Sequence, residues 1–175
     1  YHEATPGHHH QIAHSLENED LTLYRRFGYG TSAFSEGWAL YSERLALEAG
    51  LAENPYDELG ILQSEIFRAV RLVVDTGMHY KRWTREEAME YMKSITGMSD
   101  TEVRVEIERY IVWPGQALSY KVGMIKILEL REKAMSELGD DFNIKDFHSA
   151  VLDHGNPPLF IVEEMVNSMI DDAKN

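Results

Sequence analysis

Residues 54–77 read NPYDELGILQSEIFRAVRLVVDTG, and this stretch decides the fold class. Asn54 followed by Pro55 is typical of a helix N-cap with proline at the first helical position. Behind it, apolar side chains recur at intervals of three and four residues, the spacing of one face of an α-helix: Leu59, Leu62, Ile66, Ala69, Val70, Val73 and Val74. The pattern predicts a long helix that ends near Thr76-Gly77.

Similar helix signals occur on both sides of this stretch. Thr84-Arg85-Glu86-Glu87 and Ser99-Asp100-Thr101-Glu102 are capping boxes, each of which marks the start of a helix. Further helices are expected over 33–50, 116–138, 143–152 and 156–170, with Pro114-Gly115 breaking the chain before the second of these. Alternating β-branched residues, the signal of a strand, are missing. We therefore expect one all-α domain over residues 1–175, with about seven or eight helices.

The N-terminal region gives a less regular pattern. Residues 1–16 have a helical composition but contain Pro6-Gly7, which is expected to kink the helix or to restart it because proline has no backbone N–H. Residues 18–32 contain Gly28 and Gly30 and are interpreted as a loop. Near the other end of the long helix, Asp75 is interpreted as pairing with Arg71, four residues earlier.

Composition excludes several classes of function. The net charge of −13 argues against nucleic-acid binding, which requires a basic surface. With no cysteine in the chain, a transition metal would have to be bound by His, Asp and Glu. No apolar run approaches the roughly eighteen residues of a membrane span.

The chain begins at Tyr1-His2-Glu3, inside what looks like a functional motif. We interpret it as the C-terminal catalytic portion of a longer protein, whose compartment, cytoplasmic or exported, stays open. Apolar surface that packs on missing segments would then be exposed, and large exposed patches favour association. For the isolated chain we therefore expect a homodimer.

Residues 2–9, HEATPGHH, begin like the HExxH zinc motif and then depart from it. In HExxH two histidines one helical turn apart bind the metal, and the glutamate acts as the base. Here Pro6 occupies the position of the second histidine. His8 would reach the metal if the helix bulged by two residues, and His9 returns to the same face two turns along. Both are candidates beside His2, and Glu3 is the candidate base.

A second motif, SEGWALYSE, occupies residues 35–43. Glu36 is a candidate third ligand from a following helix, which would leave one position open for water, as catalytic zinc requires. Glu43 is seven residues later and so lies on nearly the same helical face. We expect it to accept a hydrogen bond from a ligand histidine and to orient that ring.

HEATPGHHHQ followed by SEGWALYSE resembles the domain of unknown function 885 (DUF885) family of mostly bacterial proteins. Residues 71–79, 109–110, 113–121 and 147–148 agree with it, so the resemblance covers nearly the whole chain, although only the C-terminal third or so of a typical member. The family is similar to helical zinc carboxypeptidases and oligopeptidases that use HExxH with a downstream glutamate. The resemblance therefore implies one zinc ion and a peptide substrate.

Downstream polar residues are candidates for substrate contacts. His79 and Tyr120 are the candidates for stabilising the oxyanion of the reaction. Four more polar side chains surround the Pro114-Gly115 break and could bind substrate or support the site: Arg109, Tyr110, Gln116 and Lys121. The sequence thus predicts a zinc-dependent peptide hydrolase with Glu3 as the general base. The alternative is a catalytically silent helical module for binding or assembly, with a structural metal or none.

Overall fold

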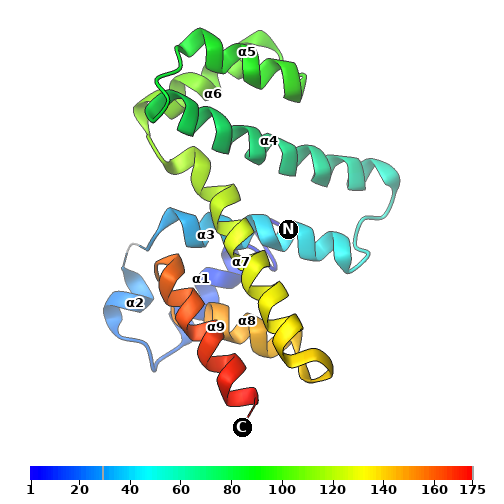
Figure 1. The fold of residues 1–175 in the computed structure, drawn as a ribbon, viewed down its shortest axis with the longest axis vertical. Helices are drawn as coiled ribbons and strands as arrows, with labels where there is room; N and C mark the ends of the chain where they lie inside the picture. The colour runs from blue at the N-terminus through cyan, green and yellow to red at the C-terminus, as the bar shows by residue number, and fades with distance from the viewer. Residues whose placement is uncertain (29, 175) are drawn as a thin grey trace.

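The protein is seen in a computed structural model that describes residues 1–28 and 30–174, and helices dominate this part of the chain (Figure 1). The α-helices are α1 (His8–Glu17), α2 (Leu23–Phe27), α3 (Ser32–Glu48), α4 (Pro55–His79), α5 (Arg85–Thr96), α6 (Asp100–Val112), α7 (Gln116–Leu138), α8 (Ile144–Leu152) and α9 (Leu159–Ala173), with a short 3-10 turn at Gly139–Asp141. No strand occurs in the described ranges, which confirms the all-α prediction. None of the helices described is long and apolar enough to cross a membrane.

Three predicted helix starts are formed by the expected side chains, whereas the last helix, predicted from residue 156, begins only at Leu159 and has no side-chain cap. Asn54 accepts hydrogen bonds from the backbone N–H groups of Tyr56 and Asp57 at the start of α4. The Thr84 and Ser99 capping boxes are both complete. In each, the side chain of the glutamate at the third helical position accepts a hydrogen bond from the backbone N–H of the capping residue. These caps satisfy N–H groups that have no partner inside a helix. Local sequence therefore fixed these boundaries.

The N-terminal region differs from the prediction in one element and settles an alternative in another. The predicted loop over residues 18–32 contains the short helix α2, which begins behind Thr22, whose side chain accepts from the Arg25 N–H. The helix predicted over residues 1–16 forms only from His8 onward, so a helix starts after Pro6-Gly7 instead of being kinked there. Gly7 adopts φ −74° and ψ −136°, which is not a helical conformation, so the helix cannot extend back through it.

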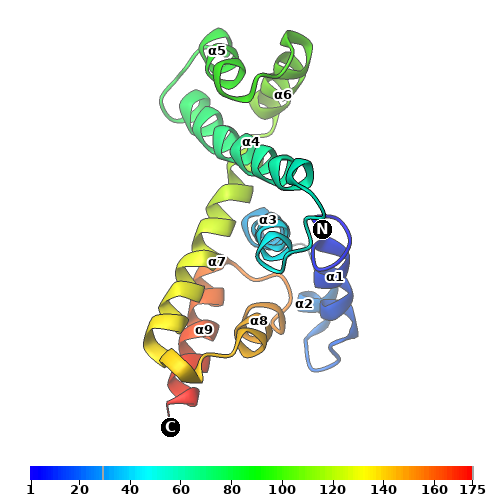
Figure 2. The same ribbon diagram turned by 90° about the vertical axis from the view of Figure 1, so that its right-hand side faces the viewer.

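The helices form two groups that share α7 (Figures 1 and 2). One hydrophobic cluster joins α3, α7, α8 and α9 around residues such as Trp38, Tyr41 and Phe147, all nearly inaccessible. The other joins α4, α5, α6 and the first turn of α7 around Met92 and Ile107. In Figure 2, α7 runs from the α4–α6 group down to α8 and α9, while the N-terminal segment lies beside α3. Helices α3, α4 and α7 contact one another, and the N-terminus lies near them.

The break at Pro114-Gly115 is present, and Asp75 stabilises it. Its buried carboxylate accepts from the N–H groups of Gly115, at 3.1 and 3.2 Å, and of Leu118, at 3.0 Å, which are orphan donors at the start of α7. Gly115 has φ +83°, a conformation that favours glycine. The interpretation that Asp75 pairs with Arg71 was wrong, because the guanidinium of Arg71 donates to Gln116.

Helices α3 and α7 cross with their backbones in contact. A Cβ atom added at Gly123 would lie 1.8 Å from the carbonyl oxygen of Ala33 and 2.7 Å from Cα of Gly37. One added at Gly37 would lie 2.5 Å from Cα of Gly123. Beside this crossing, the hydroxyl groups of Ser32 and Ser119 are 2.9 Å apart. The two glycines allow this approach, which sets the distance between Glu36 on α3 and Tyr120 on α7.

We expect Gly123→Ala to lower the free energy of unfolding by about 1–3 kcal/mol, because the new methyl group overlaps backbone atoms that cannot rotate away. This loss exceeds the roughly 1 kcal/mol by which alanine favours a helix over glycine. Gly60→Ala in α4 is the matched control, since open space surrounds that position, and it should stabilise the protein. Denaturant unfolding of both variants measures the difference. Equal midpoints would mean that the crossing has room for a methyl group.

Candidate metal centre

The two histidines of the N-terminal motif are connected by a loop that widens the helical hydrogen-bond pattern. The N–H groups of His8 and His9 donate to the carbonyl oxygens of His2 and Glu3, at 2.8 and 3.0 Å. Each bond spans six residues, whereas an α-helical bond spans four. The predicted two-residue bulge is therefore present. A Cβ atom at Gly7 would lie 1.7 Å from the His2 carbonyl oxygen, so this close approach requires glycine.

Side chains of α3 hold this N-terminal segment in place. The indole Nε1–H of Trp38 donates to the carbonyl oxygen of Pro6 at 2.8 Å. One turn further on, the Ser42 hydroxyl lies 3.1 Å from the carbonyl oxygen of Tyr1. Trp38 is 1% exposed, so the loop is fixed to the core of the domain. The fold thereby orients His2 and His8 toward α3.

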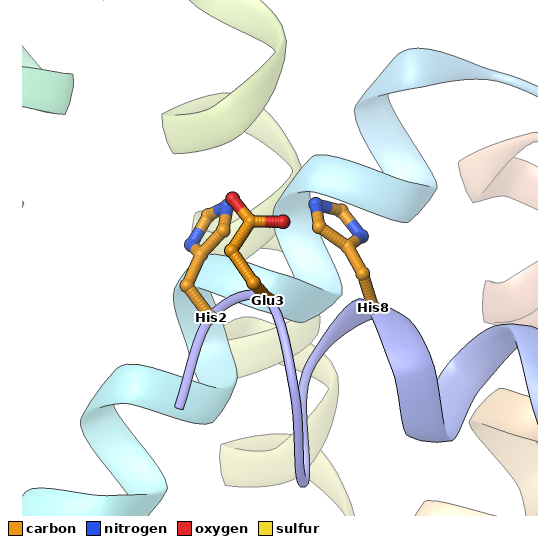
Figure 3. Close-up of side chains that lie close together, drawn as sticks. All are labelled: His2, Glu3 and His8. Atoms are coloured by element: carbon orange, nitrogen blue, oxygen red, sulfur yellow. The ribbon is translucent and has the colours of Figure 1, made fainter.

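The side chains of His2, Glu3 and His8 point the same way, with Glu3 between the two rings (Figure 3). Their ligand atoms lie within 4.8 Å of one another. Glu36 reaches the same place from α3, with Oε2 3.7 Å from His2 Nε2 and 3.1 Å from His8 Nε2. Two imidazole nitrogens and a carboxylate oxygen therefore converge, and a second carboxylate lies beside them.

The other nitrogen of the His2 ring contacts Glu43. Nδ1 is 2.7 Å from Oε1 of Glu43, whose Oε2 accepts from the hydroxyl of Ser64 on α4 at 2.7 Å. With Nδ1–H donating to a carboxylate, the ring directs Nε2 toward Glu36 and His8. This is the orienting contact that the spacing of Glu36 and Glu43 predicts.

The charges of the site favour a cation. Burial favours the neutral form of the His2 ring, but hydrogen bonds to Glu36 and Glu43 raise its pKa to about 9. Burial likewise opposes ionisation of Glu36, but hydrogen bonds with His2 and His8 lower its pKa to about 2. The pKa of Glu43 is also lowered, by hydrogen bonds with His2 and Ser64 that outweigh burial. Near neutral pH both carboxylates are therefore ionised around a protonated His2, a proton that a metal ion would replace.

Tyr120 and Gln116 lie on the α7 side of the same cluster. The Tyr120 ring stacks on His2 with centroids 6.0 Å apart, and its hydroxyl accepts from Nε2 of Gln116 at 3.1 Å. Nε2 of Gln116 also lies 3.5 Å from Oε1 of Glu36. Arg71 donates to the amide oxygen of Gln116 at 3.0 Å, which fixes the NH₂ group toward Tyr120 and Glu36. The Arg71 guanidinium also lies 4.2 Å from the centre of the Tyr120 ring.

Other predicted residues lie at different distances from this cluster. His9 is exposed at the second position of α1, so the arrangement favours His8 as the partner of His2. Nε2 of His79 lies 3.0 Å from the Tyr110 carbonyl oxygen and 3.5 Å from Asp75, contacts that belong to the α4–α6 group. Of the two oxyanion candidates, the fold brings Tyr120 to the cluster and leaves His79 apart from it.

The remaining three predicted residues lie at the edge of the site or form contacts outside it. Arg109 reaches the amide oxygen of Gln116 at 3.4 Å. Tyr110 is buried, and its hydroxyl donates to Glu106 at 2.6 Å. Lys121 pairs with Glu65 at 2.7 Å, which links α7 to α4. Arg109 therefore supports Gln116, whereas Tyr110 and Lys121 hold helices together.

Sequence reasoning missed the contribution of α4. A guanidinium nitrogen of Arg68 lies 4.0 Å from Oε1 of Glu43, and the guanidinium is 5.8 Å from the centre of the Tyr120 ring. Arg71 is buried, with an exposed fraction of only 3%. Two arginines three residues apart share a helical face. Long charged side chains within an otherwise apolar pattern, at Arg68 and Arg71, are the signal that could have identified them.

The converging atoms suit a tetrahedral metal ion. Ligands about 2.1 Å from a zinc ion in tetrahedral geometry lie about 3.4 Å from one another. The separations of Glu36 Oε2 from the two Nε2 atoms, 3.7 and 3.1 Å, fall on either side of this value. Nitrogen and oxygen ligands without thiolate are among those that zinc accepts. His2, His8 and Glu36 therefore fit one such ion as its three protein ligands, and Glu3 is not needed as a ligand.

The cluster adjoins two cavities. One has a volume of about 600 Å³ and is lined by Glu3 and His8 together with residues of α1 and α2. The other, of about 540 Å³, is lined by His2 and Glu43 with residues of α4. Both volumes are typical of ligand sites. The site is therefore accessible from two sides.

Comparison with known proteins places these features in a family. None of the curated proteins matches the chain. A crystal structure of a candidate lipoprotein from Colwellia psychrerythraea is 55% identical, with a TM-score of 0.93 over 98% of this chain and 29% of that one. The structure of a candidate lipoprotein of unknown function from Shewanella oneidensis is 30% identical, with a TM-score of 0.86 over 95% of this chain and 30% of that one.

The chain thus spans less than a third of the length of either solved relative. The family model described as a bacterial protein of unknown function (DUF885) matches residues 1–166, which include every residue of the candidate metal centre. The protein belongs to the DUF885 family.

Proposed function

We propose that this chain carries the metal centre of a zinc-dependent peptide hydrolase, with His2, His8 and Glu36 as the ligands. The observation that carries the proposal is the convergence of three ligand atoms at separations that suit one ion, with a fourth group, Glu3, beside them. A structural zinc site is closed by four protein ligands, whereas a catalytic one has three and an open position. Glu3 is exposed and lines a cavity, which supports the catalytic alternative.

His2, His8 and Glu36 would hold the zinc ion, which would supply a Lewis acid to polarise a peptide carbonyl group and activate water. Glu3 then accepts the proton of the attacking water and passes it to the amine that leaves. Its carboxylate lies between the two histidine rings and faces the cavity, so it can reach both groups.

Tyr120 is the group that we assign to the developing oxyanion. Its phenolic oxygen accepts a hydrogen bond from Gln116, and its O–H, which donates to Glu36 in this structure, would turn to the oxyanion once Glu36 binds the ion. Arg71 holds Gln116 in the orientation that this requires, and the Arg71 guanidinium over the ring adds positive charge where negative charge develops. Glu43 keeps Nε2 of His2 directed at the ion.

The test is metal content together with peptide cleavage, measured on the complete natural protein. We expect about one zinc ion per chain, loss of cleavage of a peptide library after chelation, and its return when zinc is added back. Zinc that stays bound in a protein unable to cleave any peptide would favour the catalytically silent module with a structural metal. A protein that binds no divalent ion would contradict the metal centre itself.

The homodimer expected for the isolated chain stays a prediction. Leu59, Leu62 and Ile66 of α4, which the sequence pattern places on an apolar face, are 52%, 44% and 45% exposed. Such a face favours association when nothing covers it. Sedimentation of the isolated chain at several concentrations would measure its mass.

A further inference from the structure

The cavity beside Glu3 and His8 has two buried polar atoms without partners on its wall. Nε2 of Gln11, on α1, has no hydrogen-bond partner within the described residues, although Gln11 is only 6% exposed. Asn156 also lines the cavity, and its buried Oδ1 has no hydrogen-bond partner among the described residues either. Buried polar atoms are nearly always paired. One free donor and one free acceptor on the same wall match the C=O and N–H groups of a peptide.

The position of Asn156 depends on Gly30. A Cβ atom at Gly30 would lie 1.9 Å from Cγ of Asn156, so any side chain there would displace the carboxamide. Gly30 and Asn156 both line the cavity, from segments far apart in the sequence. The chain therefore leaves space for an amide group at the cavity wall.

The same cavity is electropositive in a protein of net charge −13. Arg25 and Arg26 of α2 line it, and Glu3 is the only carboxylate among its described lining residues. Arg26 donates to the carbonyl oxygen of Leu16, whereas Arg25 has one weak contact, 3.4 Å from the carbonyl oxygen of His154. No carboxylate of the described chain pairs with either arginine. Arg25 therefore has N–H donors available for a carboxylate ligand.

The second cavity contrasts with the first. Besides His2 and Glu43 it is lined by Glu53 and Asp57, which would repel a carboxylate. Glu3, the group that protonates the leaving amine, lines the first cavity and not the second. The leaving fragment, which carries the C-terminus of the peptide, therefore lies on the side of Arg25.

We infer that the cavity lined by Gln11, Arg25 and Asn156 binds the C-terminal end of a peptide, whose free carboxylate pairs with Arg25. Gln11 donates to a peptide carbonyl group and Asn156 accepts from a peptide N–H. The inference rests on the proposed function for the position of the scissile bond. It makes the protein a carboxypeptidase that requires a free C-terminus.

Binding can be measured without catalysis in the zinc-loaded complete protein carrying Glu3→Gln. The probes are fluorescein-labelled tetra-alanine with a free C-terminal carboxylate and the same peptide with a C-terminal amide, followed by fluorescence anisotropy. We expect the carboxylate to bind about tenfold to a hundredfold more tightly, the range of a charged hydrogen bond. Arg25→Gln should remove this preference, whereas Arg104→Gln, an exposed arginine outside the cavity, should keep it.

Gln11→Met tests the peptide contact. It should weaken binding of both probes several-fold, while the thermal midpoint stays equal or rises, because the lost amide has no partner in the free protein. A lower midpoint with unchanged binding would show a merely structural Gln11 and overturn its role.

Two outcomes separate this inference from the proposed function. Cleavage of carboxylate and amide peptides at equal rates would overturn the C-terminal site and leave the hydrolase intact. Carboxylate-dependent binding that requires Arg25, in a protein that cleaves no peptide, would support the site and contradict the hydrolase.

Discussion

Glu3→Gln is expected to leave zinc bound and to lower kcat for peptide hydrolysis by a factor of about 10²–10⁴. Glutamine has nearly the same shape as glutamate but cannot accept a proton from the attacking water. The measurement is steady-state kinetics on the complete natural protein, with zinc content determined on the same samples. Retained activity would exclude Glu3 as the general base.

This variant also separates two roles for the same carboxylate. Glu3 lies within 4.8 Å of the ligand atoms of both histidines, so it could ligate the ion itself. A base that does not ligate leaves zinc content unchanged, whereas loss of zinc in Glu3→Gln would identify a ligand. Glu17→Gln, an exposed carboxylate at the end of α1, is the control and should change neither quantity.

The second large effect concerns the histidines. His2→Ala and His8→Ala should each weaken zinc binding by more than the factor of about 10–100 that loss of a partner behind a ligand usually costs. Glu43→Gln, which changes such a partner of His2, should fall within that range. His9→Ala should leave affinity unchanged, since its side chain is exposed.

Competition with a chromogenic chelator measures all four affinities under one condition. His8→Ala and His9→Ala change adjacent residues at the start of α1. Each variant therefore controls for the effect of the other on helix stability. Strong binding in His8→Ala together with weak binding in His9→Ala would reverse the assignment of the ligand.

Much of the fold could be predicted because its signals are local. The caps at Asn54, Thr84 and Ser99 depend on residues within a few positions of each other, and all three are formed. Helix α2 escaped prediction because five residues give too little periodicity to recognise. The segment before His8 was misjudged because helical composition says nothing about the close approach of Gly7 to the His2 carbonyl group.

The candidate site likewise has contacts that local sequence predicts and contacts that it does not. The seven-residue spacing of Glu36 and Glu43 predicts that both face one side of a helix, and both do contact His2. No spacing in the sequence, in contrast, relates Arg71 to Gln116, or Gln11 to Asn156, since these pairs come from different helices or loops. Such contacts depend on how the helices cross, which local sequence does not determine.

The glycine contact between α3 and α7 limits how this protein can move. Helices usually slide past each other through small adjustments of the side chains between them, and at Gly37 and Gly123 no such layer exists. The two helices therefore rotate as one rigid body that carries Glu36, Gln116 and Tyr120. The loop that carries His2 and His8 belongs to the same body, because Trp38 and Ser42 of α3 hold carbonyl groups of that segment. The geometry of the metal centre is therefore insensitive to small movements of the other helices.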